Sequence, residues 1–305
     1  MLRAGVVGVG YLGKRHAEKY AASAKAQLVG VVDIIPDRSR QVGENLDVTS
    51  LTDYRDLLAQ VSCVSIAVPT NLHYEVTSAF LSAGVDVLVE KPMAATLEEG
   101  KKLVDLAKKW NRILQIGHLE RFNPAVRKLE TIIREPRFIE CHRLAPFVER
   151  GTDVDVVFDL MIHDIDIIAS LVRAPVERVD AVGVPILTDK PDIANARIRF
   201  TNGSIANITS SRVSMKRERK IRFFQPDAYI SLDYDAKRAQ IYRKTGPGKG
   251  LESILAETVE MQDGDALADE IDCFLESVRS REPPLVSGED GLRALTIASM
   301  ISEQL

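Results

Sequence analysis

Two short stretches of the chain carry side chains that could move a proton to or from a hydroxyl group. Asp159 and His163 stand four residues apart, so on a helix they share one face. Histidine is the natural base for a hydroxyl proton near neutral pH, and a carboxylate beside it can orient the ring or bind a second hydroxyl. Lys91, within Glu90-Lys91-Pro92, can stabilise an alkoxide by its charge. These residues predict acid–base chemistry on a substrate that bears hydroxyl groups.

Each stretch also has a simpler interpretation. Lys91 can be a surface lysine paired with Glu90, and His163 can be packed in a helix start rich in carboxylates. Asp and His four residues apart can also ligate a divalent ion, but the sequence offers no obvious third ligand, so we expect no metal site. Lys91 stands at the carboxyl end of a predicted strand, the edge where parallel sheets bind ligands, and this position favours a catalytic role.

A glycine-rich turn near the N-terminus predicts a dinucleotide site. Gly8, Gly10 and Gly13 form G-x-G-x-x-G between an apolar run and a helical pattern, and Asp33 follows Gly13 by twenty residues. The N–H groups at the helix start would hold the pyrophosphate. Asp33 would accept hydrogen bonds from the ribose of NAD and would repel the 2′-phosphate of NADP, so we expect NAD as the cofactor. The alternative is a glycine-rich turn without a cofactor.

Further cofactor contacts are expected on this turn and at the ends of neighbouring strands. The residues concerned are Tyr11, Leu12, Ile34, Pro69, Thr70, Asn71, His73, Glu90, Lys91 and Arg121. His73 can equally be no more than a helix-start residue. Arg38 and Arg40 could offset the repulsion of a 2′-phosphate, but Pro36 and Asp37 separate them from Asp33.

The elements that must position these residues fall into two groups. In the first third, apolar β-rich runs alternate with helical patterns, which predicts a parallel sheet with helices on both faces. The expected strands are Leu2–Val7, Leu28–Asp33, Cys63–Val68, Val85–Glu90 and Ile113–Ile116, and the expected helices are Tyr11–Ser23, Asp53–Ala59, His73–Ala83 and Thr96–Trp110.

After about residue 120, β-like runs follow one another with few helices between them. The expected strands are Arg137–Ala145, Val176–Leu187, Ala194–Thr201, Ser204–Ser211, Arg219–Phe224 and Ala228–Tyr234, the expected helices are Pro124–Glu135, Val156–Leu171, Asp265–Arg279 and Glu289–Leu305, and Thr245–Gly250 is an expected loop. We therefore expect an α/β Rossmann domain, a doubly wound parallel sheet, over residues 1–120. A substrate-binding and oligomerisation α+β domain, with a large, open, mostly antiparallel sheet, follows over 121–305, and its last helix can pack back on the first domain.

Composition limits the possible partners and locations. At 305 residues the chain suits two domains, and a net charge of −4 gives no basic field that would draw it to nucleic acid or a membrane. The three cysteines are far apart and form no C-x-x-C, which favours a reducing compartment. With neither a signal segment nor a stretch long enough to span a bilayer, we expect a cytoplasmic protein.

The glycine turn, Glu90-Lys91-Pro92 and Asp159-x-x-x-His163-Asp164 together resemble the Gfo/Idh/MocA oxidoreductase family, and the similarity extends over essentially the whole chain. The resemblance implies tightly held NAD(H) or NADP(H), a sugar, cyclitol or related polyol as substrate, and a homodimer or homotetramer formed through the exposed sheet face. It also implies that Lys91 contacts the reacting hydroxyl, that His163 is the acid–base residue and that Asp159 is its substrate-binding partner.

Within that family, the stretches 117–124, 143–147 and 153–163 resemble the UDP-N-acetylglucosamine 3-dehydrogenases, which supply a 3-keto sugar for amide-linked lipid A. His163 would then take the proton of the sugar 3-hydroxyl while the hydride passes to the nicotinamide and Lys91 stabilises the alkoxide. The expected substrate contacts are Lys91, His118, Asn123, Arg143, Asp159 and His163, and the side chains that could neutralise a diphosphate are Arg143, Arg212, Lys216 and Arg219.

Three alternatives remain open at this point. The basic run at 216–220 can be merely a solvated strand edge. The substrate can be an inositol or a free sugar, which is neutral and would not need that run. The chain can also be a non-catalytic NAD-binding sensor, although a pure binder has no need of Lys91, Asp159 and His163.

Overall fold

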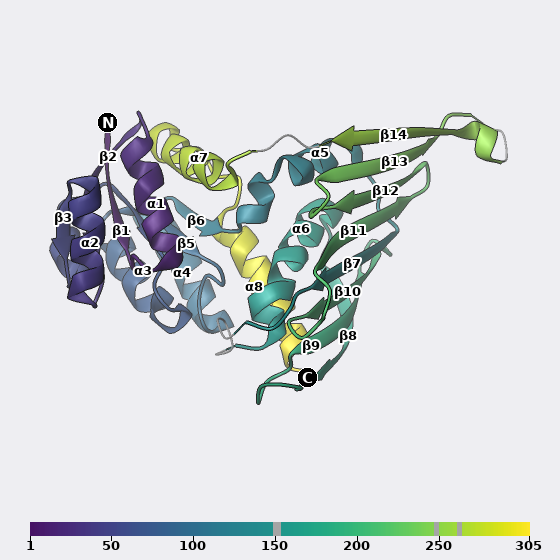
Figure 1. Cartoon of the computed structure of the whole chain (residues 1–305), viewed down its shortest axis with the longest axis horizontal. Helices are drawn as coiled ribbons and strands as arrows, with labels where there is room; N and C mark the ends of the chain where they lie inside the picture. Colours follow the sequence, from purple (N-terminus) through teal and green to yellow (C-terminus); the bar gives the residue numbers. More distant parts are fainter. Residues whose placement is uncertain (149–153, 247–249, 261–263) are drawn as a thin grey trace. The chain divides into compact units, whose positions relative to one another are not determined.

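The computed structural model describes residues 1–148, 154–246, 250–260 and 264–305 (Figure 1). Asp153 and residues 247–249 of the expected loop Thr245–Gly250 lie outside the described residues. The chain forms two compact units. The first comprises Met1–Phe122 and Asp265–Leu295, and the second comprises Asn123–Gly264 and Thr296–Leu305.

The first unit is built on a six-stranded sheet in the order β3-β2-β1-β4-β5-β6, in which all neighbouring strands are parallel. Its strands are β1 (Leu2–Val7), β2 (Ala26–Val32), β3 (Thr49–Leu51), β4 (Cys63–Ile66), β5 (Asp86–Glu90) and β6 (Leu114–Gly117). The chain runs outward from β1 in one direction and from β4 in the other. The crevice beyond the carboxyl ends of β1 and β4 is thus the switch point where such sheets bind ligands.

Helices connect these strands and pack on both faces of the sheet. They are α1 (Tyr11–Ala22), α2 (Pro36–Leu46), α3 (His73–Ser82) and α4 (Leu97–Trp110), with short helical turns η1 (Tyr54–Leu57), η2 (Thr70–Leu72) and η3 (Leu119–Phe122). Because crossovers between parallel strands are right-handed, α1 and α2 lie on one face and α3 and α4 on the other. The doubly wound sheet predicted from the sequence is confirmed.

Two C-terminal helices, α7 (Ala266–Ser280) and α8 (Gly288–Ser302), follow the last strand of the second unit. The apolar side of α7 presents Ile271 and Phe274 to the core of the first unit, where they pack with Ala17 and Tyr20 of α1. The expected second domain over 121–305 is therefore not one continuous segment, because Asp265–Leu295 belongs to the first unit.

The second unit contains an eight-stranded sheet in the order β14-β13-β12-β11-β7-β10-β9-β8, in which only β7 and β10 pair in parallel. Its strands are β7 (Phe138–Leu144), β8 (Val176–Val184), β9 (Ile193–Phe200), β10 (Ile205–Ser211), β11 (Glu218–Gln225), β12 (Ala228–Asp233), β13 (Arg238–Lys244) and β14 (Ile254–Glu260). Side chains alternate between buried and exposed along β7 and β9. One face is covered by α5 (Pro124–Ile132) and α6 (Ile162–Val172), as Figure 1 shows. The large, mostly antiparallel sheet is confirmed.

The structure differs from the sequence prediction in several elements. The expected helix Asp53–Ala59 is a single turn, η1, and the expected strand Val176–Leu187 stops at Val184. Strands β13 and β14 were not predicted, and β14 is an almost fully exposed edge strand without apolar alternation. Within the described residues, no helix combines the length and the apolar character needed to cross a membrane.

Candidate functional site

The three glycines of the N-terminal turn each meet a different steric demand. Gly8 has a φ of +83°, and a Cβ there would lie 2.7 Å from the carbonyl oxygen of Ala67. At Gly13 a Cβ would overlap the carbonyl oxygen of Gly8, so only glycine lets α1 pack this close to β1. A Cβ on Gly10 would meet only Arg38 Nη1, at 4.0 Å. The backbone at Gly10 is thus open to a ligand.

The start of α1 fits the pyrophosphate of a dinucleotide. Among the described residues no side chain caps this helix, and its first turn holds no acidic residue. Its N–H groups and the positive end of its dipole therefore point toward the open side of Gly10. Tyr11, Leu12 and Ile34 leave 61%, 41% and 81% of their surface exposed beside this turn. Such exposed apolar side chains are typical of a ligand-binding surface.

Asp33 follows β2 and links it to the glycine turn. Its Oδ2 accepts a hydrogen bond from the Val9 N–H at 3.0 Å, and its Oδ1 accepts one from the Ile35 N–H at 3.0 Å. Arg38 Nη1 lies 3.3 Å from Asp33 Oδ2, although Pro36 and Asp37 intervene in the sequence. The carboxylate stands where it can receive a ribose hydroxyl, with a cation beside it.

His73 and the residues before it connect two strand ends. Pro69, Thr70 and Asn71 lie between β4 and α3, as expected. His73 is buried, its Nδ1 lies 2.7 Å from the carbonyl oxygen of Pro92, and its Nε2 lies 2.9 Å from that of Val68. Burial lowers the pKa of His73, against the effect of these two contacts. Because a backbone oxygen lies within hydrogen-bond distance of each ring nitrogen, His73 connects the end of β4 to the Glu90-Lys91-Pro92 turn, and its expected cofactor contact stays a prediction.

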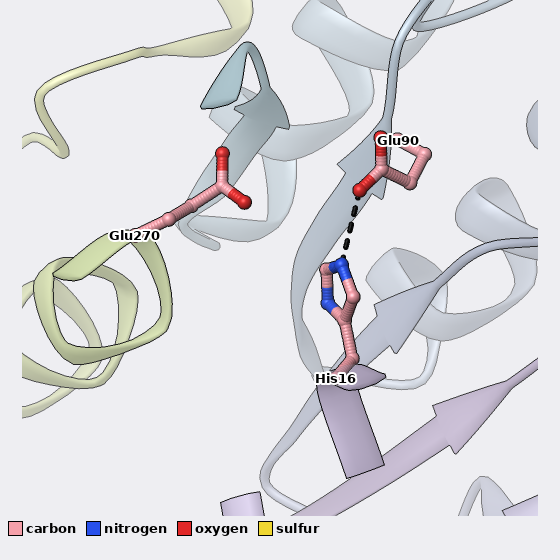
Figure 2. Close-up of side chains that lie close together, drawn as sticks. All are labelled: His16, Glu90 and Glu270. Atoms are coloured by element: carbon pink, nitrogen blue, oxygen red, sulfur yellow. Dashed lines mark hydrogen bonds and ion pairs between the residues drawn. The ribbon is translucent and has the colours of Figure 1, made fainter. Parts of the chain in front are cut away.

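Glu90 ends β5 and points inward, whereas Lys91 begins the turn that follows, and the Lys91–Pro92 bond is cis. Glu90 Oε1 lies 3.0 Å from His16 Nε2. The dashed line in Figure 2 marks this contact. The Glu90 carboxylate also lies against β6, where a Cβ on Gly117 would come within 3.0 Å of Oε2. Burial would raise the pKa of Glu90, but the hydrogen bond and charge of His16 and the charge of Lys91 hold it below its usual range.

The expected acid–base pair belongs to the second unit. Asp159 lies in a π-helical turn, η4 (Val157–Met161), and His163 is the second residue of α6, which follows directly. The expected helix Val156–Leu171 thus begins with a widened turn of a kind that is frequent at functional sites.

Arg143 and Asp164 fix the start of α6 to the sheet. Arg143 Nε lies 2.7 Å from Asp164 Oδ2 and Nη2 lies 2.9 Å from Oδ1, and both residues are buried. A buried bidentate pair of this kind is strong and directional. We expected Arg143 to contact the substrate diphosphate. Its guanidinium holds Asp164, the residue next to His163, and the expected substrate contact of Arg143 stays a prediction.

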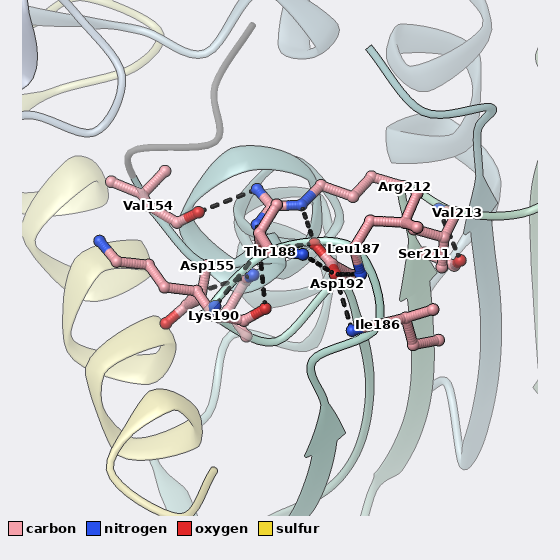
Figure 3. Close-up of polar contacts among 11 residues, drawn as sticks. Val154, Asp155, Ile186, Leu187, Thr188, Lys190, Asp192, Ser211, Arg212 and Val213 are labelled. Carbon is pink, nitrogen blue, oxygen red and sulfur yellow. Dashed lines mark hydrogen bonds and ion pairs between the residues drawn. The ribbon is translucent and has the colours of Figure 1, made fainter. Parts of the chain in front are cut away.

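The Arg212 guanidinium is likewise hydrogen-bonded to other residues of the protein, as Figure 3 shows. Its Nε donates to Asp192 Oδ1 at 2.8 Å and its Nη1 donates to the Val154 carbonyl at 2.9 Å. Asp192 Oδ2 accepts the N–H groups of Ile186, Leu187 and Thr188. Both charged side chains are buried, so Arg212 closes this loop, and its expected contact with a diphosphate stays a prediction.

The remaining expected contacts are spread over both units. His118 and Arg121 are buried near η3 in the first unit, and the Asn123 side chain caps α5 in the second by accepting the Ala125 N–H. In the basic run, Arg217 pairs with Asp235 and Lys220 with Asp233, whereas Lys216 is exposed.

Sequence reasoning missed His16 and Glu270, which lie close to Glu90. The sequence feature that could have indicated His16 is its place on the same face of the helical pattern as Gly13 and Tyr20, which are also buried.

Comparisons with known proteins agree with this geometry. A family model described as an oxidoreductase family with an NAD-binding Rossmann fold matches residues 2–118, and the GFO/IDH/MocA C-terminal domain matches residues 125–230. UDP-N-acetylglucosamine 3-dehydrogenase of Acidithiobacillus ferrooxidans is 39% identical and aligns with 98% of this chain and 96% of its own. The chain belongs to the Gfo/Idh/MocA oxidoreductase family.

One further relative and one solved structure are also similar to this chain over its whole length. Myo-inositol 2-dehydrogenase of Thermotoga maritima is 27% identical over 100% of the chain and 96% of its own. A solved structure of the Acidithiobacillus ferrooxidans enzyme covers 100% of this chain and 97% of its own, with a TM-score of 0.93 and 38% identity. The Gfo/Idh/MocA chain described here is therefore an NAD-dependent dehydrogenase of the kind that acts on sugar hydroxyl groups, with the NAD-binding domain first.

Proposed function

We propose that this chain oxidises the 3-hydroxyl of UDP-N-acetylglucosamine to a ketone with NAD as the hydride acceptor. The observation that carries this proposal is the 39% identity, over nearly the whole of both chains, to an enzyme named for that reaction. The myo-inositol dehydrogenase that also aligns with the whole chain is 27% identical.

Three residues carry the chemistry in this proposal. His163 takes the proton of the 3-hydroxyl, because a histidine near neutral pH is matched to that transfer. Lys91 donates a hydrogen bond to the same oxygen and stabilises the negative charge that develops on it. Asp159 binds a neighbouring hydroxyl and orients the sugar. When bound, NAD supplies the nicotinamide carbon that accepts the hydride.

The four basic side chains that could bind the diphosphate differ in burial and in their partners. Arg143 and Arg212 are buried and bonded to Asp164 and Asp192, so they are poor candidates. Lys216 is exposed at the start of the basic run. We assign the diphosphate contact to Lys216 and Arg219, which lie on or next to β11.

We further propose a homodimer or homotetramer formed through the outer face of the large sheet. Tyr229 stacks between Phe224 and Tyr242, and Phe138 extends this row across four strands. Aromatic side chains are enriched at protein interfaces. We place the enzyme in the cytoplasm, where its keto sugar would serve lipid A synthesis.

Calorimetric titration of the NAD-loaded protein tests the substrate class. UDP-N-acetylglucosamine and UDP should both bind, whereas N-acetylglucosamine and myo-inositol should bind at least tenfold more weakly. Binding of myo-inositol alone would favour the second candidate, an inositol dehydrogenase, which the full-length similarity to the Thermotoga maritima enzyme supports. Absence of NADH formation with every sugar would favour the non-catalytic sensor.

A further inference from the structure

Three ionisable side chains from distant parts of the sequence meet inside the first unit. His16 comes from α1, Glu90 from the end of β5 and Glu270 from α7 (Figure 2). Their ligand-type atoms all lie within 4.8 Å of one another. His16 and Glu270 are fully buried, and the Glu90 side chain is 13% exposed.

The two carboxyl groups of this cluster differ in their partners. Glu90 is bonded to His16 at 3.0 Å. Neither oxygen of Glu270 has a hydrogen-bond partner among the described residues. A buried carboxylate without a partner costs far more free energy than a buried neutral acid. Two carboxylates this close in a buried cluster also oppose each other's ionisation.

Both electrostatic influences on Glu270 act in the same direction. Burial raises its pKa well above the usual range, and the charge on Glu90 raises it further. Other ionisable groups stand on the elements packed against α7, namely His16, Lys19 and Tyr20 on α1 and Glu120 and Arg121 on η3, and Lys25 lies between α1 and β2. Lys19 and Lys25 pair with Asp265 and Asp272, at the exposed edge of α7.

We propose that Glu270 is an uncharged carboxylic acid in the folded protein, and that His16 and Glu270 are positioning residues that hold a single negative charge, on Glu90, behind Lys91. The role toward Lys91 rests on the proposed function, whereas the protonation of Glu270 does not.

A contact with Ser65, which Tyr20 contacts in turn, fixes the position of His16 on the side away from Glu90. His16 Nδ1 lies 3.1 Å from Ser65 Oγ, and the Tyr20 hydroxyl lies 2.9 Å from the same oxygen. Ser65 therefore sets the plane of the imidazole, and the imidazole sets the place of the Glu90 carboxylate. On its other side, the Glu90 carboxylate lies so close to Gly117 of β6 that position 117 has no room for a Cβ. Glu90 is thus held on both sides, directly before Lys91.

The first test compares the urea unfolding of the wild type with that of Glu270→Gln between about pH 4 and pH 9, a range that begins below the ordinary glutamate pKa of about 4.3. The folded-state pKa of Glu270 is raised, so the stability that its proton supplies is complete below the unfolded-state pKa and is lost as pH rises. Glutamine has the same shape and no charge at any pH. We expect its urea midpoint to match the wild type at low pH and to exceed it by a margin that grows toward pH 9. A lower midpoint for Glu270→Gln at neutral pH would mean that Glu270 is ionised and paired, and would overturn the proposal.

Glu276→Gln is the matched control. Glu276 lies on the same helix, its side chain is 42% exposed, and it pairs with Arg279. The difference between the urea midpoint of this variant and that of the wild type should not grow toward pH 9. If Glu270→Gln does not fold, the wild type labelled with ¹³C at its glutamate carboxyl carbons replaces it. One resonance should keep the chemical shift of the acid at pH 7, and ordinary titration of every glutamate would overturn the proposal.

The second test addresses the positioning role. Glu270→Ala and His16→Ala should lower kcat at least tenfold with little change in KM for NAD, and Glu270→Gln should restore most of the loss. Failure of Gln to restore kcat would exclude a neutral Glu270. One bound divalent ion per chain, lost in His16→Ala, would also overturn the proposal, because both carboxylates would then be metal ligands. If no sugar is oxidised but the urea midpoints of the wild type and Glu270→Gln still diverge toward pH 9, the proposed function fails and the protonation of Glu270 stands.

Discussion

Replacing Asp192 with Asn should destabilise the second unit more than any surface charge substitution. Asp192 is fully buried, and its two oxygens accept bonds from Arg212, from the Thr188 hydroxyl and from three backbone N–H groups. Asn has one acceptor oxygen, so its amide N–H₂ must face either those N–H groups or the guanidinium. It also replaces the carboxylate of a buried ion pair with Arg212 by a neutral amide, and breaking a buried ion pair costs about 3–5 kcal/mol.

Urea unfolding followed by far-ultraviolet circular dichroism measures this loss. Circular dichroism is preferred because the single tryptophan, Trp110, reports on the first unit. With an m-value of about 3 kcal/mol/M, the midpoint should fall by about 1–2 M. Asp180→Asn is the matched control, since Asp180 pairs with Arg178 at 2.6 Å but both side chains are more than half exposed. That change should cost less than about 1 kcal/mol.

The pH dependence adds a second constraint on Asp192. Burial would raise its pKa, but the Arg212 bond and the backbone N–H groups outweigh burial and hold the pKa far below its usual range. A depressed pKa contributes stability that is present above the unfolded-state value, about 3.9, and is lost as pH falls through the folded-state value. The gap between wild type and Asp192→Asn should thus be constant above about pH 5 and narrow only in acid. An Asn variant within about 1 kcal/mol of wild type at neutral pH would refute this reasoning.

Three further predictions concern the cofactor and the reaction. Asp33→Ser should raise the preference for NADP over NAD at least tenfold, because the carboxylate is removed while Arg38 remains, and initial rates with the two cofactors would detect an unchanged ratio. Gly13→Ala should abolish NAD binding by calorimetry, because its methyl group would overlap the Gly8 carbonyl, so retained affinity would contradict the assigned packing. His163→Asn should lower kcat by about 10²–10⁴, and full turnover by this variant would remove His163 as the base.

The sheet of the first unit could be predicted from the sequence because each of its features is local. The glycine turn, the apolar run before it and Asp33 lie within one β-α-β segment, where spacing alone dictates geometry. The capped start of α4 is equally local, since Thr96 and Glu99 satisfy each other's backbone groups.

The features that were missed depend on contacts between distant residues. Glu270 and His16 meet only because α7 packs against α1, and no local pattern announces that contact. A sequence also displays the charge of Arg143 and Arg212 without their partners. Both were therefore expected at a diphosphate, although Asp164 and Asp192 take up their guanidinium groups in the fold.

The most direct test of the proposed function is the oxidation of UDP-N-acetylglucosamine by the purified chain with NAD. NADH would be followed by its near-ultraviolet absorbance, and the product would be reduced with borodeuteride to mark the carbon that had become a ketone. We predict NADH formation with the UDP sugar, none with myo-inositol, and deuterium at C3. NADH formation with myo-inositol alone, or deuterium at another carbon, would contradict it.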